Sequence, residues 1–279
     1  MATAAPGAVP DVVPLTTDAQ LASLWRDVLA PSFPPAELIT LEALRAGCRS
    51  GEQTAHGVER GGHVTAGVVA SWSPATRVLL LDYLAIAPGG RGGGLGGLLL
   101  DRSVAAWRAE RAPALVLAEV EHPGHHAAHP QHGDPAARLR FYARHGAGAL
   151  AVPYFQPGMN GPGSPRVPAM LLLALDVGDD LRDGESHDLP GDLPGDLPHD
   201  VPGDLPHDVP GDPVLRFLTE HLVACEGVLV DDAATRRLLA AASAERVPLV
   251  DPGDRVALAA VPVGILEGAE QYAPPGSAG

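Results

Sequence analysis

The residues with the clearest chemical potential form a glycine-rich stretch, RGGGLG, at 91–96. An apolar run at Val78–Ile86 precedes it, and the pattern of 97–111 predicts a helix after it. Glycines that lead from a strand into a helix expose backbone N–H groups, and the helix dipole favours negative charge there. The stretch is therefore predicted to hold a phosphate group. A flexible loop is the alternative, but the position between a strand and a helix favours the phosphate site.

Two nucleotide-binding patterns can be compared with these glycines. Gly92–Gly97 satisfies the G-x-G-x-x-G fingerprint of dinucleotide-binding proteins, and Glu119 or Glu121 follows at about the expected distance for a ribose-binding carboxylate. However, Ala87–Arg91 separates the strand from the first of these glycines, whereas the fingerprint opens directly off its strand. A dinucleotide-binding oxidoreductase is therefore the less favoured alternative. A P-loop is excluded because no Lys-Ser or Lys-Thr pair closes the glycines.

A third pattern, R-x-x-G-x-G, is met by Arg91, Gly94 and Gly96, and FYARHGA at 141–147 adds an aromatic-Tyr-x-x-x-Gly sequence at the end of a predicted helix. The predicted elements are two early helices, antiparallel strands, the strand–loop–helix unit, a strand, a helix and two final strands. In motif and element order, residues 11–176 resemble the GNAT superfamily of acetyl-CoA-dependent N-acyltransferases. The resemblance implies an α/β (α+β type) fold with a mixed, mostly antiparallel twisted sheet flanked by helices. It also implies acetyl-CoA as the donor and an amine as the acceptor.

The resemblance assigns a coenzyme A site to the glycine loop and to the strand before it. The backbone N–H groups of the loop would cradle the pyrophosphate, because a glycine has no Cβ to hold the backbone away from a phosphate. The end of the strand would pair with the pantetheine arm, and an amide near Ile86 would polarise the thioester carbonyl. The predicted site comprises Leu84, Ala85, Ile86, Arg91, Gly92, Gly93, Gly94, Leu95 and Gly96.

Direct acetyl transfer requires a proton for the departing thiolate. A phenol with a pKa of about 10 can donate to a thiolate whose conjugate acid has a pKa of about 8.5. The resemblance places Tyr142 at the position of this acid, and a packed tyrosine beside Phe141 is the alternative.

The base is predicted to be Glu119, which shares a face with Glu121 at the end of a strand. Asp82, inside an apolar run, is a second candidate. Each carboxylate could instead pair with an arginine, and the family often uses a chain of waters in place of one base.

Histidine and cysteine are common metal ligands, so their spacing in the sequence is informative. Five histidines lie in a loop with Gly and Pro, at positions 122, 125, 126, 129 and 132. Their irregular spacing favours a mobile loop over the substrate mouth rather than a metal site. Cys48 and Cys225 show neither metal-ligand spacing nor a disulfide framework. We therefore predict no metal cofactor.

The charge of the chain is concentrated in one segment. All 19 basic side chains are Arg, the formal net charge is −15, and 46% of the residues are hydrophobic. Residues 176–212 hold twelve acids and one Arg, so the remainder carries only −4. This balance argues against nucleic acid and anionic membranes as partners. From His187 the tetrapeptides HDLP, GDLP and HDVP repeat, and a proline at every fourth residue excludes helix and sheet.

Four segments are expected along the chain: a disordered arm at 1–10, a GNAT-like acyltransferase domain at 11–176, a disordered Asp/Pro-rich linker at 177–212 and a small, mainly helical extension at 213–279. The sequence shows no signal-peptide pattern and no apolar run of roughly 20 residues, so a cytoplasmic protein is expected. A homodimer remains open. The second functional hypothesis is a non-catalytic acyl-CoA-binding sensor or interaction module, with the repeat and the extension as its partner surface.

Overall fold

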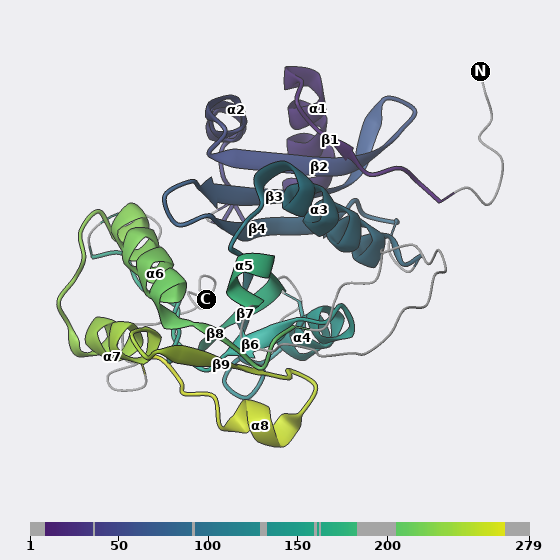
Figure 1. The fold of residues 1–279 in the computed structure, drawn as a ribbon. Coiled ribbons are helices and arrows are strands. Elements are labelled where there is room, and N and C mark those ends of the chain that lie inside the picture. The colour runs from purple at the N-terminus through teal and green to yellow at the C-terminus, as the bar shows by residue number, and fades with distance from the viewer. Residues whose placement is uncertain are drawn as a thin grey trace, which may run out of the picture. The chain divides into compact units, whose positions relative to one another are not determined.

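The computed structural model describes residues 9–35, 37–90, 93–128, 133–158, 161, 163–182 and 205–265. These residues belong to two compact units. The first contains 1–73 and 79–111, and the second contains 74–78 and 112–279. Each unit has its own run of strands and helices (Figure 1).

The first unit is a sheet with helices, and its strands lie in the order β1-β2-β3-β4. The pairs β1–β2 and β2–β3 are antiparallel. Its elements are β1 (Val13–Pro14), α1 (Asp18–Ser23), the π-helical segment η1 (Leu24–Leu29), α2 (Leu41–Ser50), β2 (Gln53–Arg60), β3 (His63–Ser73), β4 (Val78–Ile86) and α3 (Leu95–Arg111).

Local sequence signals explain the first helix and its packing. Thr17 caps α1, because its hydroxyl accepts a hydrogen bond from the backbone N–H of Gln20 and the Gln20 side chain bonds back to the Thr17 backbone. Behind this cap, Leu21 and Leu24 are completely buried and pack in a core that also contains residues of β2, β3 and β4. The early helix is thereby fixed to the sheet.

The predicted strand–loop–helix unit is present. β4 covers Val78–Ile86 with the bounds that the sequence predicts, and its first four residues are buried. α3 begins at Leu95, two residues before the predicted start, and ends at Arg111. Gly94 has a φ of +72°, a left-handed conformation that favours glycine and directs the chain into α3.

The second unit contains five strands in the order β5-β7-β6-β9-β8. All four pairs between neighbours in this order are antiparallel. Its elements are β5 (Leu115–Glu121), α4 (Pro135–Arg144), β6 (Gly148–Leu150), β7 (Met170–Val177), α5 (Asp179–Arg182), β8 (Asp208–Pro210), α6 (Gly211–Glu226), α7 (Ala233–Ala242), β9 (Arg246–Val250) and α8 (Arg255–Ala259).

The C-terminal extension contributes strands as well as helices. β9 pairs with β6 on one side and with β8 on the other, so the extension continues the sheet of the second unit. β8 lies inside the segment 177–212, all of which was predicted to be a disordered linker. That prediction is corrected at Asp179–Arg182, which forms α5, and at Asp208–Pro210, where a partner strand is available and Val209 is completely buried. The repeat residues 187–204 lie outside the described residues.

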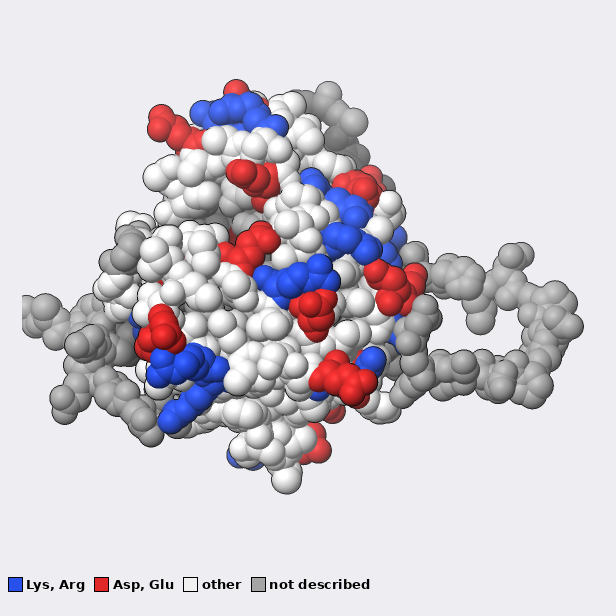
Figure 2. Space-filling view, turned by 60° about the vertical axis from the view of Figure 1, so that its left-hand side comes forward, with Lys and Arg blue, Asp and Glu red and all other residues white. Residues whose placement is uncertain are grey.

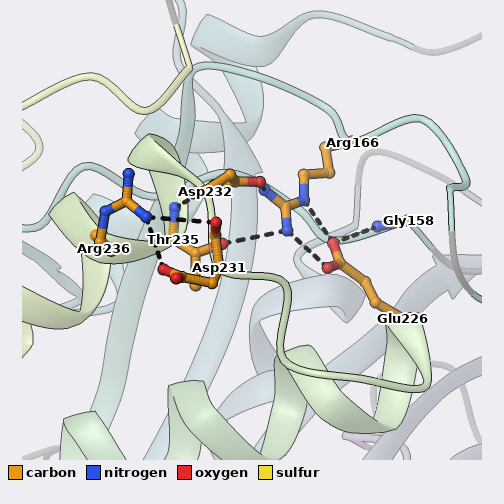
Figure 3. A network of polar contacts seen from close by, with 7 residues as sticks. All are labelled: Gly158, Arg166, Glu226, Asp231, Asp232, Thr235 and Arg236. Carbon is orange, nitrogen blue, oxygen red and sulfur yellow. Dashed lines mark hydrogen bonds and ion pairs between the residues drawn. The ribbon is translucent and has the colours of Figure 1, made fainter.

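A polar network fixes the extension to the loop before β7 (Figure 3). The guanidinium of Arg166 contacts both carboxylate oxygens of Glu226, at 2.6 Å and 2.7 Å, and a third nitrogen contacts Asp232 at 2.7 Å. Glu226 is 3% exposed and also accepts a bond from the backbone N–H of Gly158. Helices α6 and α7 pack against each other next to this network. The extension is therefore bound to the loop by buried charge as well as by strand pairing.

Charge is distributed in small groups on one face of the described part of the protein. On the face that Figure 2 presents, arginine side chains lie beside acidic ones and do not form a continuous basic area. Ion pairs between neighbouring arginine and aspartate side chains include Arg26–Asp27 and Arg236–Asp231. Among the described residues, no helix is long and apolar enough to cross a membrane.

Candidate active site

A cleft of about 770 Å³ lies at the predicted phosphate loop. It is lined by the segment 87–90, by Gly93–Leu95 and Leu98 at the start of α3, and by Arg60 and Thr65 of the β2–β3 hairpin. Its volume falls within the range of roughly 300–1,000 Å³ that is typical of small-molecule sites. Of the predicted loop residues, Gly93, Gly94 and Leu95 line this cleft, and Arg91 and Gly92 lie outside the described residues.

The start of α3 offers backbone donors that have no acceptor among the described residues. Gly94 accepts the hydrogen bond of Leu98 at 3.1 Å, so the N–H groups of Leu95, Gly96 and Gly97 precede the first intrahelical bond. The first turn carries no acidic side chain. These donors and the positive end of the helix dipole give this end of the cleft the properties of an anion site.

The glycine at position 93 has no role in packing within the protein. A Cβ built on Gly93 would meet no heavy atom within 4 Å, and its φ lies outside the left-handed region. Gly94 differs, because its positive φ requires glycine for conformational reasons. The absence of a side chain at Gly93 keeps the cleft open and the backbone accessible.

The end of β4 combines predicted residues with one that the sequence analysis missed. Ala85 is buried in the core, whereas Leu84 and Ile86 are half-buried. The hydroxyl of Tyr83 donates to the carbonyl of Glu37 at 2.8 Å and accepts from the N–H of Ile39 at 3.0 Å. Tyr83 thus holds the segment between the early helices against β4.

Glu119, the predicted base, lies in a closely hydrogen-bonded cluster. Its Oε1 accepts a 2.5 Å bond from the hydroxyl of Tyr154, and its Oε2 accepts a 3.1 Å bond from the side-chain amide of Gln156. Nε2 of His221, from α6, lies 3.8 Å from Oε1, an ion-pair distance rather than a hydrogen bond. On the other side of the ring, Nδ1 lies 3.8 Å from Sγ of Cys225.

The cluster changes the acid–base properties of its members. Burial alone would raise the pKa of Glu119, but His221, Tyr154 and Gln156 outweigh it and lower the pKa. Burial alone would likewise lower the pKa of His221, but Cys225 and Glu119 raise it to about 10. The cluster is therefore a carboxylate–imidazolium pair at neutral pH. A carboxylate with a lowered pKa and two occupied oxygens is a weak proton acceptor.

The other two candidate carboxylates also have partners. Asp82 accepts a 2.7 Å bond from the hydroxyl of Ser71. Glu121 lies 3.6 Å from Arg138 and 3.9 Å from His126. Ion pairing with arginine, one of the two interpretations that the sequence left open, therefore applies to Glu121.

Tyr142, the predicted acid, lies on the buried side of α4 and is 5% exposed. Burial raises the pKa of its hydroxyl to about 12. Its ring packs edge-on against Phe141, with ring centres 5.1 Å apart. The phenol therefore stays protonated at neutral pH, although burial makes it a weaker acid than an exposed tyrosine.

The histidine loop is only partly described, because His129 and His132 lie outside the described residues. His122 is buried, which lowers its pKa, and its ring lies 4.9 Å from that of His125. Nε2 of His126 lies 2.8 Å from the carbonyl oxygen of Pro168. Within the described part of the chain, no three His, Cys, Asp or Glu side chains gather as metal ligands would.

No protein-family model and no curated protein matches the chain. Several solved structures do. A GNAT-family protein from Bacteroides thetaiotaomicron is 24% identical over 59% of this chain and 85% of its own, with a TM-score of 0.45. The ribosomal-protein-S18-alanine N-acetyltransferase from Escherichia coli is 16% identical over 66% of this chain and 100% of its own, with a TM-score of 0.42. The ribosomal-protein-alanine N-acetyltransferase from Brucella melitensis is 18% identical over 58% and 97%, with a TM-score of 0.41.

The functional candidates that sequence reasoning missed are Tyr154, Gln156, His221 and Arg60. His221 gave a usable signal, because it is a titratable residue on the apolar stripe of α6 that also contains Leu218 and Leu222. The other three gave none, because only the fold determines their neighbours.

Proposed function

We propose that the protein is an acetyl-CoA-dependent N-acetyltransferase that moves an acetyl group to the primary amine of a small molecule or peptide by direct transfer. The observation that carries the proposal is the cleft at the glycine loop, where α3 begins with the N–H groups of Leu95, Gly96 and Gly97, which have no acceptor among the described residues. The R-x-x-G-x-G motif and the resemblance to acetyltransferases support the same donor.

In this proposal the glycine loop binds the coenzyme A pyrophosphate, and the end of β4 at Leu84–Ile86 pairs with the pantetheine arm. The neutral amine attacks the thioester carbonyl carbon, a C–N bond forms and the C–S bond breaks. Tyr142 supplies the proton of the departing thiolate, the nitrogen loses one proton to solvent or to a carboxylate, and the Tyr142 phenolate regains a proton from solvent. Because its pKa is raised, the phenol acts best by hydrogen bonding to the thiolate as charge develops.

Glu119 remains the proposed acceptor-side carboxylate. Its lowered pKa favours attraction of a cationic amine over the removal of a proton from it. Water then carries the amine proton away. The acceptor itself is to be found with a panel of amines, aminoglycosides and peptide N-termini.

The proposal is tested by thiol release from acetyl-CoA across this panel. We expect amine-dependent release, and in Tyr142→Phe we expect a fall in kcat of roughly a hundredfold with an unchanged KM for acetyl-CoA. Phe141→Leu is the matched control, because it disturbs the packing of the same helix turn but keeps the phenol. Acetyl-CoA that neither binds nor releases thiol with any amine contradicts the proposal.

A non-catalytic acyl-CoA-binding module is the second candidate. The observation in its favour is that burial weakens Tyr142 as an acid while Glu119 is engaged by neighbours. This function predicts acyl-CoA binding without thiol release, and equal affinity in wild type and Tyr142→Phe.

A further inference from the structure

Arg60 is the only charged side chain among the described residues that line the glycine-loop cleft. It is the last residue of β2, next to the Gly61–Gly62 turn, and it is exposed. Otherwise the described lining is glycine, proline, aliphatic side chains and Thr65. Among the described lining residues, a single positive charge therefore shares the cleft with the N-terminus of α3.

Backbone contacts hold the hairpin of Arg60 against the glycine loop. The N–H of Ala87, at the start of that loop, donates a 2.9 Å bond to the carbonyl of Thr65 in β3. The hydroxyl of Thr65 donates to the carbonyl of Val58 in β2 at 3.2 Å. Arg60 is paired in register with His63, two residues before Thr65. The position of Arg60 beside the loop thus follows from the sheet.

The charged neighbours of Arg60 are already paired elsewhere. Glu59 accepts a 3.2 Å bond from the side chain of Gln20, and Nδ1 of His63 lies 3.4 Å from Asp27. No described side chain or backbone group makes a hydrogen bond or an ion pair with the guanidinium of Arg60. A guanidinium with no partner among the described residues is available to a ligand.

We propose that Arg60 binds a phosphate group of coenzyme A, an inference that rests on the proposed function. Coenzyme A carries two phosphate-containing groups, a pyrophosphate and a 3′-phosphate. The N–H groups at the start of α3 can bind only the phosphate group that lies next to them. The planar guanidinium binds phosphate oxygens with two parallel hydrogen bonds, as no other described side chain that lines the cleft can. Arg60 therefore supplies a phosphate contact in addition to the start of α3.

Titration calorimetry with the full chain tests the proposal. The probes are coenzyme A, 3′-dephospho-coenzyme A and pantetheine, against wild type and Arg60→Gln. We expect the variant to bind coenzyme A roughly ten- to a hundredfold more weakly and pantetheine equally well. If Arg60→Gln loses affinity for coenzyme A but not for 3′-dephospho-coenzyme A, the partner of Arg60 is the 3′-phosphate. If it loses affinity equally for both, the partner is the pyrophosphate.

Arg49→Gln is the matched control, because it removes the same charge from the same unit at an exposed residue that pairs with Asp18. Its affinity for coenzyme A is expected to equal that of wild type. Equal affinity of Arg60→Gln and wild type would overturn the assignment of Arg60 and leave the proposed function intact. Wild-type protein that binds no coenzyme A would contradict the proposed function itself. Unchanged melting of Arg60→Gln excludes a folding effect.

Discussion

The hydroxyl of Tyr154 donates a 2.5 Å hydrogen bond to Oε1 of Glu119. Tyr154 is completely buried and Glu119 largely so, and His221 from the C-terminal extension lies at ion-pair distance from the same oxygen. The carboxylate with the clearest catalytic interpretation in the sequence is thus stabilised as an anion by three residues from other segments. The extension therefore contributes to the electrostatic environment of Glu119 in β5.

Tyr154→Phe removes this hydrogen bond with little change in shape. We expect the free energy of unfolding to fall by about 1.5–3 kcal/mol, the usual range for a bond to a charged group, and the pKa of Glu119 to rise. Denaturant unfolding measures the first effect, and carboxylate titration by NMR measures the second. A variant with wild-type stability and an unshifted Glu119 would show that the short bond contributes nothing.

The ion pair of His221 with Glu119 predicts a loss of stability at alkaline pH. The pKa of His221 is raised in the folded state to about 10, above an unfolded value of 6.5. The stabilisation is therefore complete below pH 6.5 and is lost as the pH rises through about 10. One proton gives a slope of at most about 1.4 kcal/mol per pH unit in this window.

Unfolding measured from pH 6 to 10.5 in wild type and His221→Gln tests this prediction. The difference in stability between the two proteins should shrink as the pH rises. A difference that is independent of pH would mean that His221 is uncharged in the folded protein.

Gly93→Ala separates ligand binding from folding. Since a Cβ on Gly93 meets no heavy atom within 4 Å, we expect an unchanged or slightly higher melting temperature. We expect acetyl-CoA to bind at least tenfold more weakly, because the methyl group enters the cleft. Gly94→Ala is the contrasting variant, since its positive φ predicts a loss of about 1 kcal/mol in stability. Full acetyl-CoA affinity in Gly93→Ala would place the phosphates elsewhere.

Glu226→Gln tests the network that binds the extension to the loop before β7 (Figure 3). Arg166 would keep Asp232 but lose its charged, bidentate partner, so we expect a loss of about 3 kcal/mol in unfolding free energy. Asp231→Asn, in the exposed pair with Arg236, is the control and should cost less than about 1 kcal/mol. Equal losses of unfolding free energy in the two variants would mean that the buried ion pair stabilises the protein no more than the exposed one.

The elements with strong local signals could be predicted from the sequence. β4 has its predicted bounds because a continuous apolar run ends at a Pro-Gly turn. α4 begins at Pro135 behind the N-cap Asp134, as its sequence indicates. β8 could not be predicted, because its residues continue the tetrapeptide repeat and only the pairing with β9 makes them a strand.

The candidate site also has one part that could be predicted from the sequence and one part that could not. The glycine loop is a local motif and was found from the sequence. The cluster around Glu119 joins β5, the segment at Tyr154 and Gln156, and α6. No periodicity links residues so distant in sequence, and their contacts arise only from folding.

The central claim, that the donor is acetyl-CoA, is tested most directly by calorimetric titration of the full chain with acetyl-CoA and, separately, with NAD. The account predicts saturable binding of acetyl-CoA and none of NAD. Tight binding of NAD without binding of acetyl-CoA would contradict it.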